Sequence, residues 1–467
     1  MKLISGRYVI TMDRERRILE NAAIAVDAAR IVGIDTFELM SQRYPSAEII
    51  GGDAFAILPG LVNSHMHLSC GLFRGYIDDM PLLEHDVRFL FPGQRAMNDR
   101  NVYQASLLSA VELLKYGCTT TADAYLQPQA SARAMVDSGI RGIVSPAMMD
   151  TWKGGEDGPL VTSTEEALRQ VRALRDEWHG AADGRIAVWP APFTDLSASP
   201  ELMKASGELA REWGSGIQIH LCETLEGVNI IKRRHGMRVF EFADSCGLFD
   251  DNIVVAAHCC WVSEPDIAIM KRHNVSVAYC PSSESKMADG LPPVPRLLSD
   301  GINVSIAIDA TCVCNSADLL REAKLGAVLQ KVRYPYDSEV IPAEEALEMI
   351  TTLPAKALGM QDDIGSLAVG KKADVIAVRI DRAHFVPLLR APRQTVINHL
   401  IYSASGNDVE HVFVDGRQLV RDGELVHLDE RRLIADTQAE MLDFIEASGI
   451  AREITRLKWG YHETRQR

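Results

Sequence analysis

The 467-residue sequence has no apolar run of the ~18 residues that a membrane-spanning helix needs. Its first residues also lack the apolar segment of a secretory signal, so we expect a cytoplasmic protein. Positive charge is in deficit, because 49 Lys and Arg residues oppose 64 Asp and Glu residues, for a net charge of −15. A surface this acidic disfavours nucleic-acid phosphates and anionic lipid, so we expect neither nucleic acid nor a membrane as a partner.

Two common motifs are also missing. The nine cysteines are odd in number and form no Cys-x-x-Cys pair, which disfavours a disulfide framework. No Gly-x-Gly-x-x-Gly segment follows the first strand-like run of the central region, which weakens a dinucleotide-binding assignment. What the chain does have is 47% hydrophobic and 24% charged residues, a balance typical of a globular protein with a large core. It favours a small-molecule enzyme or a protein-binding role.

The order of strand-like and helical segments divides the chain into three parts. Residues 1–56 and 360–430 contain short β-branched runs that end in Asp and Gly turn signals, and they predict a small β-domain assembled from both termini. Residues 57–359 alternate apolar strand-like runs with helical stretches in eight β/α units, which predicts an α/β fold of the (β/α)8 TIM-barrel type. An open doubly wound sheet is the alternative. The last part, residues 431–467, is helical in pattern.

Four of the predicted barrel strands end in residues that bind metals. His65 and His67 close the first strand, and the alternation of a strand points both imidazoles to one face. His220, His258 and Asp309 close three later strands. Each has a structural explanation when taken singly, because such histidines can be solvated or packed in a core and the aspartate can cap a helix. Together, at one rim of a barrel, they predict a site for a divalent ion such as Zn²⁺ or Fe²⁺.

The chain resembles the amidohydrolase superfamily over almost its whole length. The resemblance is carried by residues 58–67 (LPGLVNSHMH), 365–374 (GSLAVGKKAD), 402–406 (YSASG) and 414–416 (VDG). Residues 91–97 and 184–192 resemble the branch of s-triazine hydrolases and deaminases that contains atrazine chlorohydrolase and melamine deaminase. The resemblance implies a (β/α)8 barrel with a β-sandwich built from both termini, in a chain that forms a homo-oligomer.

The resemblance also implies the chemistry of the site. By position, the ligands of one divalent metal ion, zinc or iron, would be His65, His67, His220 and Asp309. Glu223 would be the catalytic acid/base with His258 as its partner, and Asp309 would also accept a proton from the metal-activated water. The end of the fourth strand, residues 187–192, carries no lysine that would bridge two metals, so we expect one ion.

Other residues fall where relatives line the substrate pocket. The substrate contacts implied in this way are Gln94, Glu284, His85, Glu84, Phe91 and Cys70. Two of them have alternatives, since Glu284 can pair with Lys286 and Cys70 can pack in the core. Deaminases of this type usually have Ser-Asn-x-Lys where this chain has residues 283–286 (SESK), and they differ again at residues 309–315 (DATCVCN). The resemblance therefore specifies the metal chemistry more closely than the substrate.

The implied function is hydrolytic deamination of an amino-substituted nitrogen heterocycle of the s-triazine, pyrimidine or purine type by a metal-activated water. The alternatives are hydrolytic dechlorination or dealkylamination of an s-triazine, or hydrolysis of an amide, urea or carbamate C–N bond. Relatives that hydrolyse ureas and carbamates differ at the first histidine of the His-x-His pair, whereas His65 is intact here. A non-catalytic binding protein is disfavoured because the ligand set and Glu223 are complete.

Overall fold

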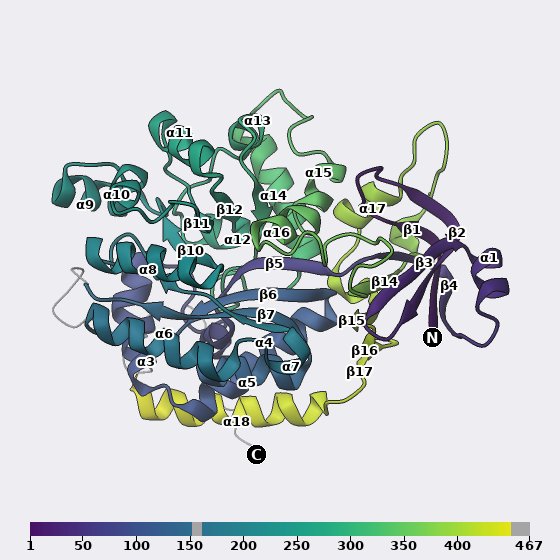
Figure 1. Cartoon of the computed structure of the whole chain (residues 1–467), viewed down its shortest axis with the longest axis horizontal. Coiled ribbons are helices and arrows are strands. Elements are labelled where there is room, and N and C mark those ends of the chain that lie inside the picture. The colour runs from purple at the N-terminus through teal and green to yellow at the C-terminus, as the bar shows by residue number, and fades with distance from the viewer. Residues whose placement is uncertain (152–160, 450–467) are drawn as a thin grey trace, which may run out of the picture.

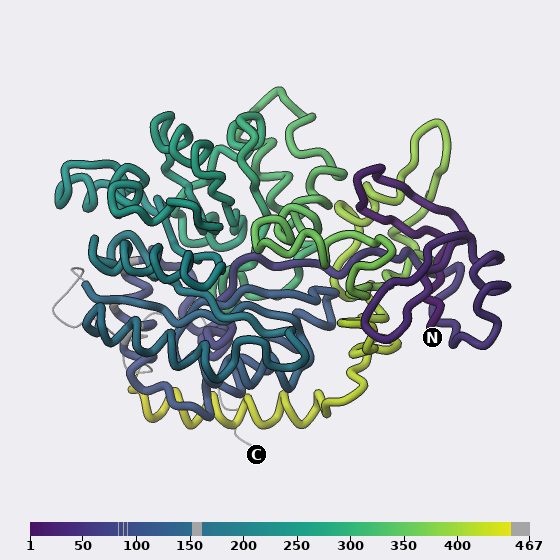
Figure 2. The backbone as a smooth tube through the Cα atoms, in the orientation of Figure 1, coloured from purple at the N-terminus to yellow at the C-terminus, as the bar shows by residue number. Residues whose placement is uncertain are grey.

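The computed structural model describes residues 1–151 and 161–449. Its central part is a barrel of parallel strands surrounded by helices, and a β-sheet made from both ends of the chain lies beside the barrel (Figure 1). The backbone tube shows the same arrangement, with the N-terminal segment in purple next to the green segments that follow the barrel (Figure 2).

The barrel strands form two hydrogen-bonded arcs, β5-β6-β7-β8 and β10-β11-β12-β13. A parallel bridge between Thr194 and His220 joins the first arc to β10, and a second bridge between Met66 and Asp309 joins the end of the second arc to β5. The ring is therefore closed, as predicted, and the open-sheet alternative is wrong. The barrel strands are β5 (Leu61–Met66), β6 (Cys118–Tyr125), β7 (Arg141–Met148), β10 (Gly216–Leu221), β11 (Ile253–His258), β12 (Ser276–Tyr279), β13 (Val304–Ile306) and a fourth strand in two pieces, β8 (Ile186–Val188) and β9 (Ala191–Pro192), which both pair with β7.

The strands are buried along nearly their whole length because helices cover the outside of the barrel and side chains fill its inside. Local signals set the helix limits: in α8, the Ser199 hydroxyl accepts from the Leu202 N–H at 3.1 Å, and Gly214 ends the helix with a φ of 59°. The main covering helices are α4 (Asp99–Lys115), α5 (Pro128–Ser138), α6 (Thr164–Trp178), α8 (Pro200–Trp213), α9 (Leu225–His235), α10 (Val239–Ser245), α11 (Glu264–His273), α13 (Val294–Ser299), α14 (Leu319–Arg333), α15 (Ala343–Glu348) and α16 (Thr352–Ala357).

Strands from both ends of the chain are hydrogen-bonded into one sheet in the order β17-β16-β15-β14-β4-β1-β2-β3. The two ends meet where β14 pairs antiparallel with β4, and Ile4, Val375 and Phe413 share one buried cluster. The prediction of a β-domain from both termini is thus confirmed. The strands are β1 (Lys2–Ile10), β2 (Ile18–Asp27), β3 (Arg30–Thr36), β4 (Glu48–Pro59), β14 (Val375–Arg379), β15 (Val409–Val414), β16 (Arg417–Arg421) and β17 (Glu424–Leu425).

Two features of this β-domain differ from the sequence-based expectation. Two helices, α1 (Phe37–Arg43) and α17 (Val396–Tyr402), interrupt regions that were expected to contain only strands and turns. Each has seven residues, too few for helical periodicity to stand out in the sequence. The expected boundary at residue 56 also falls inside β4, because the chain passes directly from β4 into β5 at Gly60. A side chain at Gly60 would lie 2.1 Å from the Thr119 hydroxyl, so this crossing requires glycine.

Arg141, at the start of β7, joins the barrel to the β-sheet. Its guanidinium donates to both carboxylate oxygens of Asp374, at 2.8 and 3.0 Å, and to Asp415 at 2.6 Å. All three residues are buried, and Arg141 lowers the pKa of Asp415 even though burial alone would raise it. Asp374 is the last residue of the GSLAVGKKAD segment, and Asp415 begins the turn after β15. These two motifs therefore join the barrel to the β-sheet at the end of the barrel opposite the histidines.

The C-terminal helix α18 (Glu430–Ser448) runs along the barrel beside α4 and α3 (Phe91–Ala96), as the yellow helix in Figure 1 shows. Phe444 of α18 packs edge-to-face on Phe73 with ring centroids 5.5 Å apart. The predicted helical part at the C-terminus is thus helical as far as Ser448, while residues 450–467 lie outside the described residues. Within residues 1–151 and 161–449, no helix is long and apolar enough to cross a membrane.

A buried carboxyl on α14 predicts how stability changes with pH. Burial raises the pKa of Glu322 from its ordinary value of 4.5 to about 7, and its carboxyl accepts hydrogen bonds from the N–H and the hydroxyl of Ser282. Because the folded state holds this proton more tightly, its stabilising contribution is complete below pH ~4.5 and is lost as the pH rises through about 7. At ~1.4 kcal/mol per pKa unit, the free energy of unfolding of Glu322→Gln should therefore rise by about 3 kcal/mol relative to that of the parent as the pH goes from 4.5 to 8.

Chemical unfolding of both proteins across this pH range measures the difference directly. The glutamine keeps an acceptor for the Ser282 N–H, and any constant offset between the proteins does not affect the trend. A difference in unfolding free energy that is the same at every pH would contradict a raised pKa for Glu322.

Candidate active site

Three imidazoles and one carboxylate converge at the carboxyl ends of the barrel strands. His65 and His67 lie at the end of β5, His220 lies in β10, and Asp309 follows β13. The His67 Nε2 is 3.2 Å from the His220 Nε2 and 3.3 Å from the Asp309 Oδ1, and the His65 Nε2 is 3.5 Å from the same oxygen. The structure therefore brings together the four residues that the sequence proposed as metal ligands.

Backbone carbonyls set the orientation of two of these rings. The His67 Nδ1 donates to the Ala124 carbonyl at 2.7 Å, and the His220 Nδ1 donates to the Phe193 carbonyl at 2.6 Å. Burial, followed by the other histidines, lowers the pKa of His67 to about 4 and the pKa of His220 well below its ordinary value. Both rings are thus neutral, and each Nε2 carries a lone pair directed at the other ring.

This arrangement fits a divalent cation. Two facing lone pairs 3.2 Å apart repel each other unless a positive charge lies between them, and the His65 Nε2 is buried with no hydrogen-bond partner. A tetrahedral ion with bonds of about 2.0–2.1 Å places its ligand atoms about 3.4 Å apart, close to the separations found here. The donor set of three nitrogens and one oxygen suits zinc or iron.

Asp309 is held in place by contacts on both sides. Its N–H donates to the His65 carbonyl at 3.2 Å, and its own carbonyl accepts from the His67 N–H at 2.8 Å. The Ser283 hydroxyl donates to its Oδ2 at 2.5 Å, which leaves Oδ1 for the histidines. Although burial opposes it, His65, 3.5 Å away, and the other neighbouring imidazoles lower the pKa of Asp309, so the group is a carboxylate. Its φ of 71° is a strained conformation that these contacts maintain.

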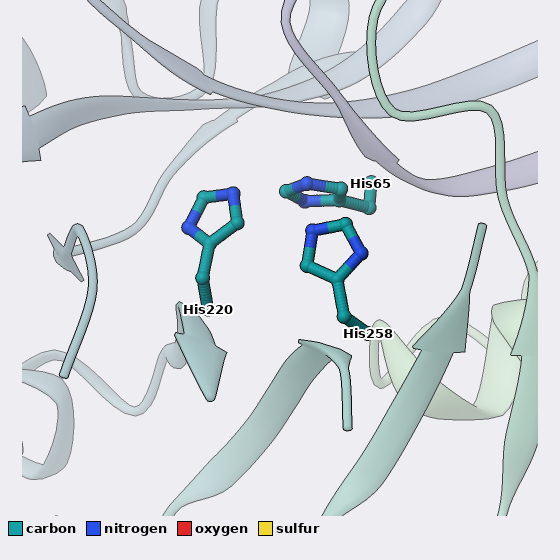
Figure 3. A group of neighbouring side chains, drawn as sticks. All are labelled: His65, His220 and His258. Carbon is teal, nitrogen blue, oxygen red and sulfur yellow. The ribbon is translucent and has the colours of Figure 1, made fainter. Parts of the chain in front are cut away.

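Glu223 and His258 lie next to the four convergent groups. The His258 Nε2 is 3.4 Å from the Glu223 Oε1, and its ring stacks on His220 with centroids 5.5 Å apart. Figure 3 shows the rings of His65, His220 and His258 pointing toward one space from three different strands. Burial, and after it the charge of Asp289, raises the pKa of Glu223 well above its ordinary value, which favours a protonated acid. Burial lowers the pKa of His258 to about 3.

A cavity of about 910 Å³, including its open mouth, lies over these groups. Gln94, His85 and Cys70, which the sequence proposed as substrate contacts, line the cavity together with Glu223. Asp86 lies 3.0 Å from His85 and, although burial opposes it, raises the pKa of His85 to about 10, so this wall of the cavity offers a cation.

The structure does not support two of the proposed substrate contacts. Glu84 is nearly half exposed and pairs with Arg88, because neighbouring residues on the short helix α2 (Leu82–His85) point in different directions and His85, not Glu84, faces the cavity. Glu284 is fully buried on α12 (Pro281–Lys286), behind His258 and outside the cavity lining. Its suggested pairing with Lys286 is also wrong, because the Lys286 ammonium contacts Asp78 and Asn315 instead. The side chain of Phe91 lies outside the described residues.

Sequence reasoning missed several residues that line the cavity. They include Tyr125, Asp86, Phe193, Thr194 and Asp195. Tyr125 ends β6 and accepts a hydrogen bond from the Gln94 amide, and Phe193 to Asp195 directly follow β9. The strand-end rule that located the histidines would have found Tyr125 too, had the second strand been extended to its last residue, whereas residues 193–195 lie beyond the end of β9. Asp86 carries no such signal, because it lies in an irregular segment.

Side chains that could hold a metal ion at the carboxyl ends of a (β/α)8 barrel, with an acid beside them in a cavity, are typical of metal-dependent barrel hydrolases. The sequence model of the Amidohydrolase family matches residues 56–419, and the chain belongs to this family.

Named relatives and solved structures agree with this membership. The chain is 35% identical to the 5′-deoxyadenosine deaminase of Methanosarcina acetivorans, over 94% of this chain and 98% of that protein. It is 33% identical to the 5-methylthioadenosine/S-adenosylhomocysteine deaminase of Thermoanaerobacter pseudethanolicus, over 95% and 99%. Among solved structures, an adenosine deaminase from Xanthomonas campestris with bound zinc superposes with a TM-score of 0.88 at 27% identity, over 95% and 98%. An atrazine chlorohydrolase from Arthrobacter aurescens superposes with a TM-score of 0.87 at 25% sequence identity, and the match covers 94% of this chain and 100% of that one. The chain is thus an amidohydrolase whose named relatives include deaminases.

Proposed function

We propose that this protein catalyses the hydrolytic deamination of an aminopurine, with adenine nucleosides of the 5′-deoxyadenosine type as the substrate class. The observation that carries the proposal is the pair of neutral, facing Nε2 atoms of His67 and His220, 3.2 Å apart beneath a cavity that Glu223 lines. The named relatives at 33–37% identity deaminate adenine nucleosides, which supports a purine among the possible heterocycles.

The proposed ligands of one divalent ion, zinc or iron, are His65, His67, His220 and Asp309. An ion held by this set would lower the pKa of a water molecule bound to it from 15.7 toward ~7 and so supply a nucleophile at neutral pH. The buried Nδ1 hydrogen bonds of His67 and His220 keep their rings oriented for this task in the folded chain.

The chain's own groups supply the proton transfers. Water adds to the ring carbon that bears the amine, the C–N bond then breaks, and the products are a ring carbonyl and ammonia. Asp309, a carboxylate, accepts the proton that the water loses. Glu223 is protonated and donates to the ring nitrogen, and as the C–N bond breaks it passes the proton of the added hydroxyl to the leaving amine. The proton held by Asp309 then returns to Glu223, and His258 stabilises the charge that develops at the attacked carbon.

The cavity walls bind and orient the heterocycle. Gln94 offers an amide, His85 with Asp86 offers a charged pair, and Cys70 offers a small apolar surface. The same catalytic groups suit dechlorination or dealkylamination of an s-triazine, so the leaving group has to be measured rather than assumed. The likeness to atrazine chlorohydrolase rests on 25% identity, lower than that to the deaminases.

A panel assay tests this function. Purified, metal-loaded protein is expected to release one ammonia per 5′-deoxyadenosine or 5-methylthioadenosine consumed, with the corresponding inosine as product. A chelator should abolish the activity, and zinc or iron should restore it with one ion per chain by elemental analysis. Chloride or alkylamine release from triazines without ammonia release from any purine would replace this proposal with the alternative hydrolase function.

A further inference from the structure

A buried carboxyl lies behind the catalytic histidine. Glu284 is fully buried, and its Oε1 lies 3.5 Å from the Nδ1 of His258, on the side of the ring opposite the cavity. The other ring nitrogen, Nε2, lies 3.4 Å from Glu223. His258 is therefore placed between two carboxyl groups, of which only Glu223 lines the cavity.

The position of Glu284 is set by its own helix. Its Oε1 accepts from the Cys280 N–H at 2.9 Å, which fixes the carboxyl at the first turn of α12. The Nδ1 of His258 is buried and has no hydrogen-bond partner among the described residues, and the carboxyl oxygen that lies beside it, at 3.5 Å, is the Oε1 of Glu284. An unpaired polar atom in such a place is costly, so a hydrogen bond from Nδ1 to this nearby carboxyl oxygen is favoured.

A neutral imidazole carries one proton, and the hydrogen bond at one nitrogen decides which nitrogen holds it. A carboxyl oxygen beside Nδ1 favours the form with the proton on Nδ1. The Nε2 lone pair then faces Glu223 and the cavity, and the carboxyl stabilises the ring if Nε2 takes a proton during the reaction. The aspartate of a serine-protease triad has this effect on its histidine.

We propose that Glu284 is a positioning residue that holds His258 through Nδ1, so that Nε2 is the nitrogen presented to the reacting groups. The proposal rests on the deaminase function proposed above. It also gives a role to a glutamate at a position where deaminases of this type usually have asparagine in their Ser-Asn-x-Lys segment.

Three variants test this role. Glu284→Leu removes the acceptor at similar size, and Glu284→Gln keeps an oxygen that can accept from both Nδ1 and the Cys280 N–H. Glu322→Gln is the matched control, because Glu322 is also a buried carboxyl bonded at the start of α12, through Ser282, but does not contact His258. For each variant, kcat, KM, bound metal and the melting temperature are measured, and the ring nitrogens are observed by ¹⁵N NMR of histidine-labelled protein.

We expect Glu284→Leu to lower kcat by about 10²-fold, with KM changed by less than about threefold and metal content unchanged. Glu284→Gln should recover most of this loss, and Glu322→Gln should match the parent in kcat, KM and metal content. In the NMR spectrum, the His258 resonance of the parent should show the proton on Nδ1, and Glu284→Leu alone should lose this signature.

Three results would overturn the proposal. An unchanged kcat in Glu284→Leu would remove the positioning role, and a raised KM at unchanged kcat would make Glu284 a substrate contact after all. A fall from two bound metal ions to one would instead assign a cation site to His258, Cys280 and Glu284, whose donor atoms lie within 4.8 Å of one another. If the parent deaminates none of the purines, the NMR arm still tests the role of Glu284, so the two failures are distinguishable.

Discussion

Glu223→Gln is expected to lower kcat by about 10²–10⁴-fold while the bound metal stays at the parent level. The reason is that Glu223 lines the cavity, lies 3.4 Å from His258 and has a raised pKa, so it is the group placed to carry protons to the heterocycle. Glutamine has the same shape but holds no acidic proton. Steady-state release of ammonia, with elemental analysis of the same sample, measures both parts of the expectation.

Glu226→Gln provides the control for this variant. Glu226 lies three residues further along, in the first turn of α9, where it is exposed and outside the cavity lining. This control should keep the parent kcat. A Glu223→Gln enzyme with near-parent kcat and one bound ion would show that another group carries the protons.

Arg141→Ala should lower the free energy of unfolding by about 3–5 kcal/mol, a large share of the stability of a typical domain. The substitution leaves Asp374 and Asp415 buried without their shared cation, at the contact between the barrel and the β-sheet. Chemical unfolding at neutral pH measures the loss. The active site lies at the other end of the barrel, so kcat at low temperature should stay within a few fold of the parent.

Arg172→Ala is the matched comparison for Arg141→Ala. Arg172 also makes two hydrogen bonds to a carboxylate, that of Glu212, but both side chains are about half exposed. Its loss should cost only about 0–1 kcal/mol. Equal losses of unfolding free energy in the two variants would mean that burial of the contacts made by Arg141 adds nothing to the stability of the barrel–sheet contact.

Much of the barrel and of the proposed metal site could be predicted because both depend on local patterns. An apolar run of five or six residues bounded by turn signals forms a strand, and its last residue faces the rim, whatever the distant chain does. His65, His67, His220 and Asp309 were found by this rule. Extending the same rule to the last residue of each strand would have added Tyr125.

The errors concern residues on short or irregular segments. Glu84 and His85 are neighbours on one helical turn, and no sequence pattern indicated which of the two faces the cavity. Glu284 was expected to contact substrate, but α12 turns its side chain back toward Cys280 and His258. Side-chain direction in a six-residue helix depends on how that helix packs, and packing is absent from a local pattern.

The sequence by itself determined the eight-stranded barrel, the β-domain from two ends and the four rim residues, because periodicity and strand-end position involve only residues close along the chain. Only the tertiary structure decided which side chains complete the candidate active site and which join the barrel to the β-sheet. Arg141 and Asp374 are 233 positions apart, and His258 meets Glu284 from a different strand–helix unit. Contacts of this kind exist only after the ring of strands has closed.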